Sequence, residues 1–198
     1  MEDKDAELML RFKEGDDSTF ERLFEKYKKP VLNMIYRFIG TKAEAEELTQ
    51  EVFLKVYQAR YSYEVRAKFA TWLYRIAKNL CFNWIRHKRI IRFFSTDNPF
   101  RAPEVEVYRE IPDSSQDPAD IVLEKKEMAE QIQNALRSLP ENQRITIILK
   151  EYERKSYDEI AQILGHSVSS VKAIIFRARE NLRHLLSKYF ERDKDIGR

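Results

Sequence analysis

The sequence predicts an all-α protein made of two small helical domains joined by a flexible linker. Only four glycines and six prolines occur in 198 residues, which favours long helices over tight hairpins. Apolar residues recur at three- and four-residue spacing through most of the chain, as on helices with one buried face. Four of the six prolines fall within residues 93–120, where this spacing is absent. We therefore expect helical domains at 1–92 and 121–198, with the linker at 93–120 between them.

Helices are expected throughout the first domain. Residues 5–39 have a helical apolar pattern, which Pro30 is expected to interrupt before a new helix begins. Gly40 is expected to end that helix, and Thr41 to begin the next with Glu44 completing a capping box. A polar loop, ARYSYEVRA, then leads into the long basic helix FATWLYRIAKNLCFNWIRHKRIIR. The helix AEAEELTQEVFLKVY between them places Leu48, Val52 and Val56 on one face and Glu46, Glu47 and Gln50 nearer the other.

Charge is arranged in blocks, although the net charge is only +3. No acidic residue occurs between Glu64 and Asp97, and the cations in this window alternate with aromatic residues. Residues 93–120 then contain seven acids against two arginines. Cations interleaved with aromatic rings suit single-stranded DNA, and Asn79 and Asn83 could bond the edge of a base turned out of the stack. The alternative is that the aromatic rings are core and that the polar residues form a solvated basic face.

The C-terminal third predicts a helix-turn-helix centred on residues 157–176. Ala161, Gly165 and Val171 have the required spacing: a small residue where the helices cross, glycine at the turn, and a branched residue in the core. Ser156 and Glu159 form a capping-box pattern. The remaining core residues are expected to be Ile160, Leu164 and Ile174. The outward face would read the DNA major groove with Ser169, Ser170, Lys172, Phe176, Arg177 and Arg179; a solvated basic helix in a bundle is the alternative.

Several classes of protein are not expected. The sequence has no signal-peptide pattern and no apolar run near the ~20 residues of a membrane span, and its one cysteine suits a reducing cytosol. It contains no GxxxxGK[ST] loop, and its three histidines have no metal-ligand spacing. We therefore expect no enzyme activity, no cofactor or metal, no small-molecule substrate and no membrane association.

Together these segments resemble a bacterial RNA polymerase sigma factor of the sigma-70 family, in its extracytoplasmic-function (ECF, group IV) subfamily. AEAEELTQEVFLKVY is similar to the helix of that family's second region, and FATWLYRIAKNL to its promoter-melting segment. LPENQRITIILKEYERKSYDEIAQILGHSVSSVKAIIFRARENL is similar to its fourth region. The resemblance covers roughly residues 5–190 except the linker. It implies a cytoplasmic protein with region 2 at 1–92 and region 4 at 121–198.

The resemblance also implies partners: core RNA polymerase through its β′ clamp helices and β flap, promoter DNA in double- and single-stranded form, and an anti-sigma factor. Glu47, Gln50 and Glu51 would contact the clamp helices. The acidic linker would pass through the polymerase cleft. The same outward face of the helix-turn-helix would read the −35 duplex, and the melted −10 strand would be held by Tyr63, Trp72, Lys78, Asn79, Asn83 and Arg86.

Two departures from the family pattern concern specificity. The loop RYSYEVRA lacks the glycine usual in relatives, and Ala173 and Ile174 replace a serine and an arginine. The promoter sequence read by this chain therefore stays open. The rival hypotheses are a polymerase-independent helix-turn-helix regulator, a nuclease, and a structural helical adaptor.

Overall fold

The computed structural model describes residues 3–94 and 119–196, with side chains for 3–91, 93 and 127–187. All regular structure in these residues is helical, as predicted. The elements are α1 (Lys4–Glu14), α2 (Asp17–Ile39), α3 (Lys42–Gln58), the 3₁₀ helix η1 (Arg60–Ser62), α4 (Phe69–Phe94), α5 (Ala119–Ser138), α6 (Glu141–Glu151), α7 (Tyr157–Leu164) and α8 (Val168–Ile196).

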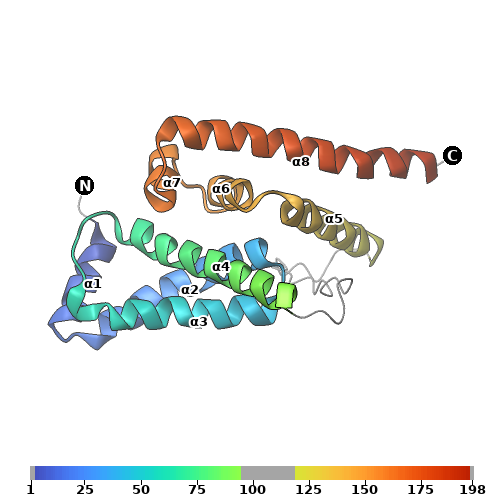
Figure 1. Cartoon of the computed structure of the whole chain (residues 1–198). Coiled ribbons are helices and arrows are strands. Elements are labelled where there is room, and N and C mark those ends of the chain that lie inside the picture. The colour runs from blue at the N-terminus through green and yellow to red at the C-terminus, as the bar shows by residue number, and fades with distance from the viewer. Residues whose placement is uncertain (1–2, 95–118, 197–198) are drawn as a thin grey trace.

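The helices form two layers, which we call the N-terminal lobe (α1–α4) and the C-terminal lobe (α5–α8). In Figure 1, α8 lies along the top with α5, α6 and α7 beneath it, and α4, α2 and α3 lie below these; α2 also contacts α5 and α6 directly. The predicted linker at 93–120 lies outside the described residues, except that α4 continues through Phe94 and α5 begins at Ala119. The prediction of two helical domains is confirmed. The two lobes also contact each other, because α4 packs against α7.

The prediction that Pro30 begins a new helix is wrong, because α2 runs unbroken from Asp17 to Ile39 with Pro30 inside it. A proline within a helix removes one backbone hydrogen bond and costs ~3 kcal/mol. Here the apolar face stays in register across the proline: Tyr27, Val31 and Met34 are all buried. Burial of this continuous face offsets the local cost, which the sequence pattern alone does not reveal.

Two other local expectations also need correction. The pattern at 5–39 contains a break, where Gly15 adopts a φ of 115° and separates α1 from α2. Thr41 begins α3 as expected, but its hydroxyl donates to the side-chain carboxylate of Glu44, so no capping box forms. By contrast, Gly40 ends α2 with a φ of 98°, as predicted.

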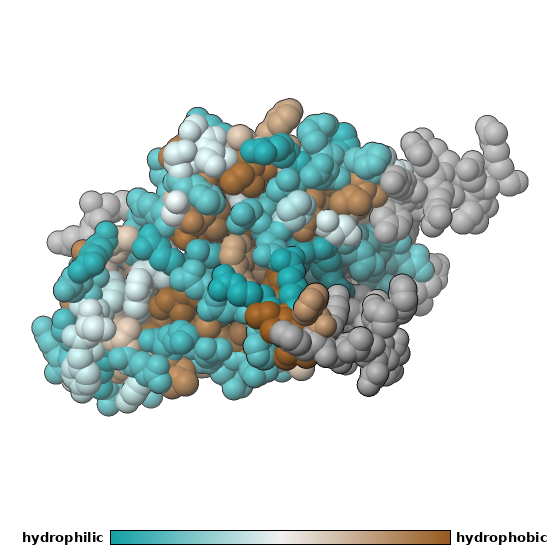
Figure 2. Space-filling view, viewed as in Figure 1, coloured by the Kyte–Doolittle hydropathy of each residue, from teal (hydrophilic) through white to brown (hydrophobic). Residues whose placement is uncertain are grey.

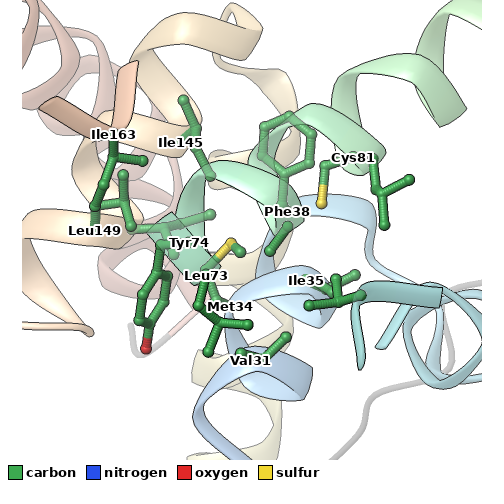
Figure 3. Packing of buried hydrophobic residues seen from close by; sticks show 14 of the residues in the cluster. Val31, Met34, Ile35, Phe38, Leu73, Tyr74, Cys81, Ile145, Leu149 and Ile163 are labelled. Carbon is green, nitrogen blue, oxygen red and sulfur yellow. The ribbon is translucent and has the colours of Figure 1, made fainter. Parts of the chain in front are cut away.

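The two lobes share one hydrophobic core. Figure 3 shows Phe38 of α2 and Tyr74 of α4 facing Ile145, Leu149 and Ile163 of the C-terminal lobe. All five side chains are at most 2% exposed. Since buried apolar area is the main favourable term in folding, separating the lobes would expose part of this core to water at a cost.

The carboxyl end of α2 is completed by the C-terminal lobe. Arg144 of α6 donates to the main-chain oxygen of Phe38 (2.8 Å) and also to that of Leu139 (3.1 Å). Gln133 of α5 donates to the oxygen of Arg37 (3.0 Å). Helix ends leave carbonyl groups without intrahelical partners, so these side chains satisfy acceptors that would otherwise need water.

Candidate nucleic-acid interface

The helix-turn-helix has the backbone geometry that its sequence predicts. Ser156 begins α7 by accepting from the Glu159 amide (3.1 Å), and the Glu159 carboxylate accepts from the Ser156 amide (2.9 Å). This reciprocal pair is the predicted capping box. Gly165 then ends α7 with a φ of 73°, and its amide donates to the Ala161 oxygen (2.9 Å). The turn between the two helices is thus fixed by main-chain bonds and by one glycine.

The core of the helix-turn-helix differs from prediction at Ile174, and the predicted core residue Leu164 is half-buried and packs against the core. Ala161, Val171 and Ile160 are buried, as expected. Ile174 is only half-buried, and Ile175 takes the core position with 2% exposure. Ile175 lies one helical turn after Val171, so it shares the face that meets α7. The neighbouring Ile174 is rotated away from that face.

The outward face of α8 carries the side chains predicted to read duplex DNA. Phe176 is 67% exposed although it is a large aromatic residue, and Arg177 is exposed beside it. Arg179 is paired with Glu151 of α6 at 2.7 Å, so this cation is held against the neighbouring helix. Ser167 caps the helix by accepting from the Ser170 amide (3.2 Å). Ser169 and Lys172 are exposed and Ser170 is half-buried.

A pocket of about 380 Å³ lies in the N-terminal lobe where η1 and the following loop meet α4. Its volume is at the lower end of the range for small-molecule sites. Trp72 forms one wall and packs edge-on against Tyr63, with ring centroids 5.0 Å apart. The pocket therefore brings together two of the predicted −10 residues. Its lining residues are Ala59, Ser62, Tyr63, Glu64, Arg66, Ala67, Trp72 and Arg75.

Tyr63 is buried in this wall. The residue is only 3% exposed, and its hydroxyl has no hydrogen-bond partner in the described structure. Phe69 and Trp72 form edge-type contacts with its ring, and because so little of the residue is exposed, an incoming base would find little open ring on which to stack. Burial, followed by the negative charge of Asp3, raises the pKa of Tyr63 to about 12.

This raised pKa predicts a pH-dependent stability. The folded pKa lies above the ~10 of an unfolded tyrosine, so the contribution is complete below pH ~10 and is lost as pH rises through about 12. We expect the free energy of unfolding of the wild type to fall between these values relative to Tyr63→Phe. The matched control is Tyr61→Phe, since Tyr61 is 75% exposed. Urea unfolding at a series of alkaline pH values measures the difference, and equal pH dependence in both variants would contradict it.

The remaining −10 candidates lie along α4 beyond the pocket. Asn79, Asn83 and Arg86 are exposed. Lys78 is half-buried, with its ammonium nitrogen 5.7 Å from the centre of the Phe82 ring. Burial, followed by the charge of Arg75, lowers the pKa of Lys78. The three exposed residues thus present polar groups on the surface of α4, while Lys78 is partly buried and packs against Phe82 of its own helix.

The outer face of α3 combines acidic and apolar side chains. Glu47 and Gln50 are exposed, and Glu51 lies 3.6 Å from Lys55. Between these polar residues and the end of the helix, Leu54 is 54% exposed and Tyr57 is 48% exposed. The sequence analysis did not identify Leu54 and Tyr57 as exposed apolar residues of this face. Their positions could have indicated it, because neither lies on the helix face that carries Leu48, Val52 and Val56.

Arg66 and Arg75 were also missed as candidate site residues. Both belong to the acid-free window, but only the fold shows that they line the pocket.

The described residues contain no cluster of three or more histidine, cysteine, aspartate or glutamate side chains suited to a metal. None of the described helices has the length and apolar content needed to cross a bilayer. Most of the face in Figure 2 is hydrophilic, with hydrophobic areas between the lobes and near the end of α4.

The fold and these surfaces define a two-lobed, all-helical DNA-binding protein with a helix-turn-helix in its second lobe. Family models match in both lobes: Sigma-70 region 2 at residues 23–90 and Sigma-70, region 4 at residues 129–182. The chain belongs to the sigma-70 family of RNA polymerase sigma factors, in the extracytoplasmic-function group, and so is a factor of transcription initiation.

Relatives extend over nearly the whole chain. The ECF RNA polymerase sigma factor SigW of Bacillus subtilis is 34% identical over 88% of this chain and 92% of its own length. The ECF RNA polymerase sigma-E factor of Escherichia coli is 32% identical over 89% and 91%. Among solved structures, the sigma factor RpoE bound to the anti-sigma factor NepR from Bartonella quintana has a TM-score of 0.68 at 21% identity, covering 85% of this chain and 96% of that one. CnrH in complex with the cytosolic domain of CnrY has a TM-score of 0.69 at 21% identity, with coverage of 94% and 99%.

Proposed function

We propose that this sigma factor directs core RNA polymerase to promoters by reading the −35 duplex with α8 and holding the melted −10 strand on α4. One observation carries the proposal: the chain pairs a correctly built helix-turn-helix with an acid-free helix that borders a pocket. The −35 and −10 elements of one promoter could then be bound at the same time. From Phe94 to Ala119 the chain is long enough, at ~3.3–3.6 Å per residue, to span about 80 Å. Element centres some 25 base pairs apart, at ~3.4 Å each, are separated by a similar distance.

The pocket would take a base turned out of the stack. Arg66 and Arg75 bring positive charge to its lining, and the Glu64 carboxylate, which lies 2.7 Å from Arg66, offers an acceptor for a base edge. Flipping costs a few kcal/mol, and capture in such a pocket offsets the loss. Asn79, Asn83 and Arg86 would contact the strand beyond the pocket. In this proposal Tyr63 contributes to the wall of the pocket together with Trp72, because its own ring and hydroxyl are buried.

The outer face of α3 would bind the β′ clamp helices of the polymerase. Glu47, Gln50 and Glu51 supply acidic and amide groups, and Leu54 adds an apolar centre. Interfaces typically combine an apolar centre with a polar rim, and acids suit a basic partner. The C-terminal lobe would meet the β flap. Binding to polymerase also places the protein in the cytoplasm.

An anti-sigma factor is a further proposed partner. The RpoE structure named above was solved with the anti-sigma factor NepR. The described part of this chain has the same overall fold, which supports the assignment of a regulator of that class.

Run-off transcription tests the function. Core polymerase is incubated with and without this protein on a genomic promoter library, and the starts that depend on the protein are mapped. We expect initiation at a distinct set of promoters that share −35 and −10 elements. Absence of any dependent start, together with no binding to core polymerase, would refute the proposal.

The reading of the −35 element has its own prediction. Arg177 is exposed on α8, and within the described residues its guanidinium makes a single long bond, to the Ala173 oxygen of its own helix (3.4 Å), so it is available to a guanine. We expect Arg177→Ala to weaken holoenzyme binding by ~1–3 kcal/mol on promoters that contain the element. Promoters without it serve as the control in the same filter-binding assay. An equal loss on both would show a contact to phosphate and would contradict base readout.

A further inference from the structure

The pocket of the N-terminal lobe is built mainly from a loop. Most of its lining belongs to residues 59–68, which join α3 to α4 through η1. The main-chain bonds within this loop are short-range, from the Ser62 amide to the Ala59 oxygen (3.1 Å) and from the Arg66 amide to the Glu64 oxygen (3.0 Å). Loops hold functional groups less precisely than helices do, unless neighbouring groups fix them. The shape of the pocket therefore depends on what surrounds the loop.

Helix α1 contacts this loop at its beginning. Figure 1 shows α1 at the end of the N-terminal lobe where the chain passes from α3 to α4, and α1 packs against both η1 and α4. The Arg60 guanidinium of η1 lies 4.4 Å from the centre of the Phe12 ring of α1 and 3.0 Å from the Asp17 carboxylate of α2. The Arg60 side chain is only 12% exposed, and withdrawal of a cation from water strengthens its attraction to an aromatic ring. The first residue of η1 is thus held against α1.

The middle of the loop is held by Lys13 of α1. Its ammonium group donates to the main-chain oxygen of Tyr63 at 3.1 Å. Lys13 is half-buried near the carboxyl end of α1 and lies outside the pocket lining. Tyr63 forms the pocket wall together with Trp72, so this bond fixes the backbone of a wall residue without occupying the pocket.

The end of the loop is held by the Asp3 carboxylate. One of its oxygens accepts from the Asp5 amide of α1 (3.2 Å), and the other accepts from the Phe69 amide of α4 (2.6 Å). The first amides of a helix have no intrahelical partners and favour negative charge nearby. Asp3 therefore caps both helices, and it places the beginning of α4 relative to α1. After burial, the charge of Asp3 is also a cause of the raised pKa of Tyr63, in keeping with its place beside the pocket wall.

We propose that α1 positions the loop of the −10 pocket through Asp3, Lys13 and Arg60, so that base choice at the pocket depends on residues that do not touch the base. This inference rests on the proposed function, whose pocket it concerns. The three are positioning residues, whereas Glu64 and Arg66 would meet the base. Misplacement of a bound group by ~1 Å can cost ~100-fold in reaction rate, so positioned sites tolerate little movement. A small shift of the loop would therefore reduce discrimination between bases.

Binding of short single strands to the holoenzyme tests the inference. The strands come from the −10 region of a promoter mapped by run-off transcription, with each position carrying each of the four bases in turn. Lys13→Met removes the donor to the Tyr63 oxygen and keeps the apolar stem. We expect the preference for one base over the others to fall at one position by about fivefold or more, as for loss of a good base contact.

Two further variants of α1 interpret that result. Lys4→Met is the control, because it makes the same charge change at an exposed residue of the same helix. It should leave the base preference unchanged. Lys13→Arg should retain most of the preference, since arginine can still donate to a main-chain oxygen. Loss of preference in Lys4→Met as large as in Lys13→Met would mean that charge, and not the bond to Tyr63, is responsible.

Asp3 gives an independent pair of variants. Asp3→Ala removes the acceptor of the Phe69 amide, whereas Asp3→Asn keeps a side-chain oxygen and asparagine caps helices about as well as aspartate. We expect alanine to reduce base preference at the same position as Lys13→Met does, and asparagine to preserve it. Equal results for alanine and asparagine, or an effect at a different position, would contradict the role of Asp3.

The fluorescence of Trp72 reports on the pocket wall without DNA. The chain has two tryptophans, so Trp84→Phe leaves Trp72 as the single emitter. Trp72 is half-buried and packs against Tyr63. In this background Lys13→Met is expected to increase the quenching of Trp72 by acrylamide, and Lys4→Met is not. Equal quenching in the two variants would show that Lys13 does not hold the loop, and would overturn the proposal.

The outcomes distinguish this inference from the function on which it rests. If Lys13→Met weakens binding of every strand by the same factor, or of none, α1 has no part in base choice; the inference fails and −10 capture stands. If the wild type binds no strand, or binds all of them equally, base capture by this lobe fails, and the inference fails with it. Affinity for a −35 duplex should be equal in all variants, and far-UV circular dichroism checks that they remain helical.

Discussion

Replacing Phe38 by alanine is expected to reduce the free energy of unfolding by ~3–5 kcal/mol. Phe38 is fully buried at the junction of α2, α4 and α6. Its ring stacks on Phe82 with centroids 5.6 Å apart, and the Arg144 guanidinium lies 5.2 Å from its centre. Truncation would leave a cavity with walls from both lobes, where relaxation of one lobe alone cannot fill the space.

The matched control is Phe93→Ala, because Phe93 is 84% exposed and loses the same atoms. Surface changes usually stay within ~0.5 kcal/mol. Urea unfolding followed by circular dichroism gives both values. Similar losses in the two variants would mean that the shared core contributes little to stability.

Arg144→Met is expected to cost ~2–4 kcal/mol, although it keeps much of the apolar stem. The guanidinium donates to three main-chain oxygens: those of Phe38 (2.8 Å), Leu139 (3.1 Å) and Arg137 (2.5 Å). Burial lowers the pKa of Arg144 to about 10, opposed by the nearby charge of Glu141, so the cation is partly desolvated at neutral pH. Methionine would leave three acceptors at the ends of α2 and α5 without this donor.

Arg183→Met is the control, since the Arg183 side chain is 72% exposed and pairs with Glu180 one turn away in α8. We expect it to change stability by less than ~0.5 kcal/mol. Arg144→Lys should recover only part of the loss, because a single ammonium group cannot reproduce the planar fork that reaches three oxygens. Full recovery by lysine would show that charge alone, without this geometry, accounts for the effect. Chemical denaturation of the three variants measures the comparison.

The sequence predicted what depends on local periodicity and on special backbone conformations. The helix-turn-helix core residues Ala161 and Val171, the capping box at Ser156 and the positive φ of Gly165 are all local features, and the structure confirms them. Where a tertiary effect outweighed a local one, the prediction was wrong. Pro30 lies inside α2 against its intrinsic preference, because burial of the long apolar face stabilises the unbroken helix.

The contacts between the lobes could not be predicted in this way. Arg144 and Arg75 look like ordinary surface cations in a chain that is 35% charged. Their partners are main-chain oxygens of Phe38 and Gln162, which have no residue-type signature. A sequence pattern identifies which face of a helix is buried, but it does not identify the helix from the other lobe that covers it. For the same reason the pocket lining was only partly predicted.

The bond from Arg144 to Phe38 has a consequence for how the chain is made. The two residues are 106 positions apart, so this contact forms only after a long stretch of chain has been closed into a loop. Synthesis proceeds from the N-terminus at ~5–20 residues per second, so α1–α4 leave the ribosome some seconds before α6 does. During that interval the apolar end of α2 can pack on α3 and α4 but lacks the cover of α5 and α6. A nascent chain halted after α4 is therefore expected to be more prone to aggregation or chaperone binding than one released after α8.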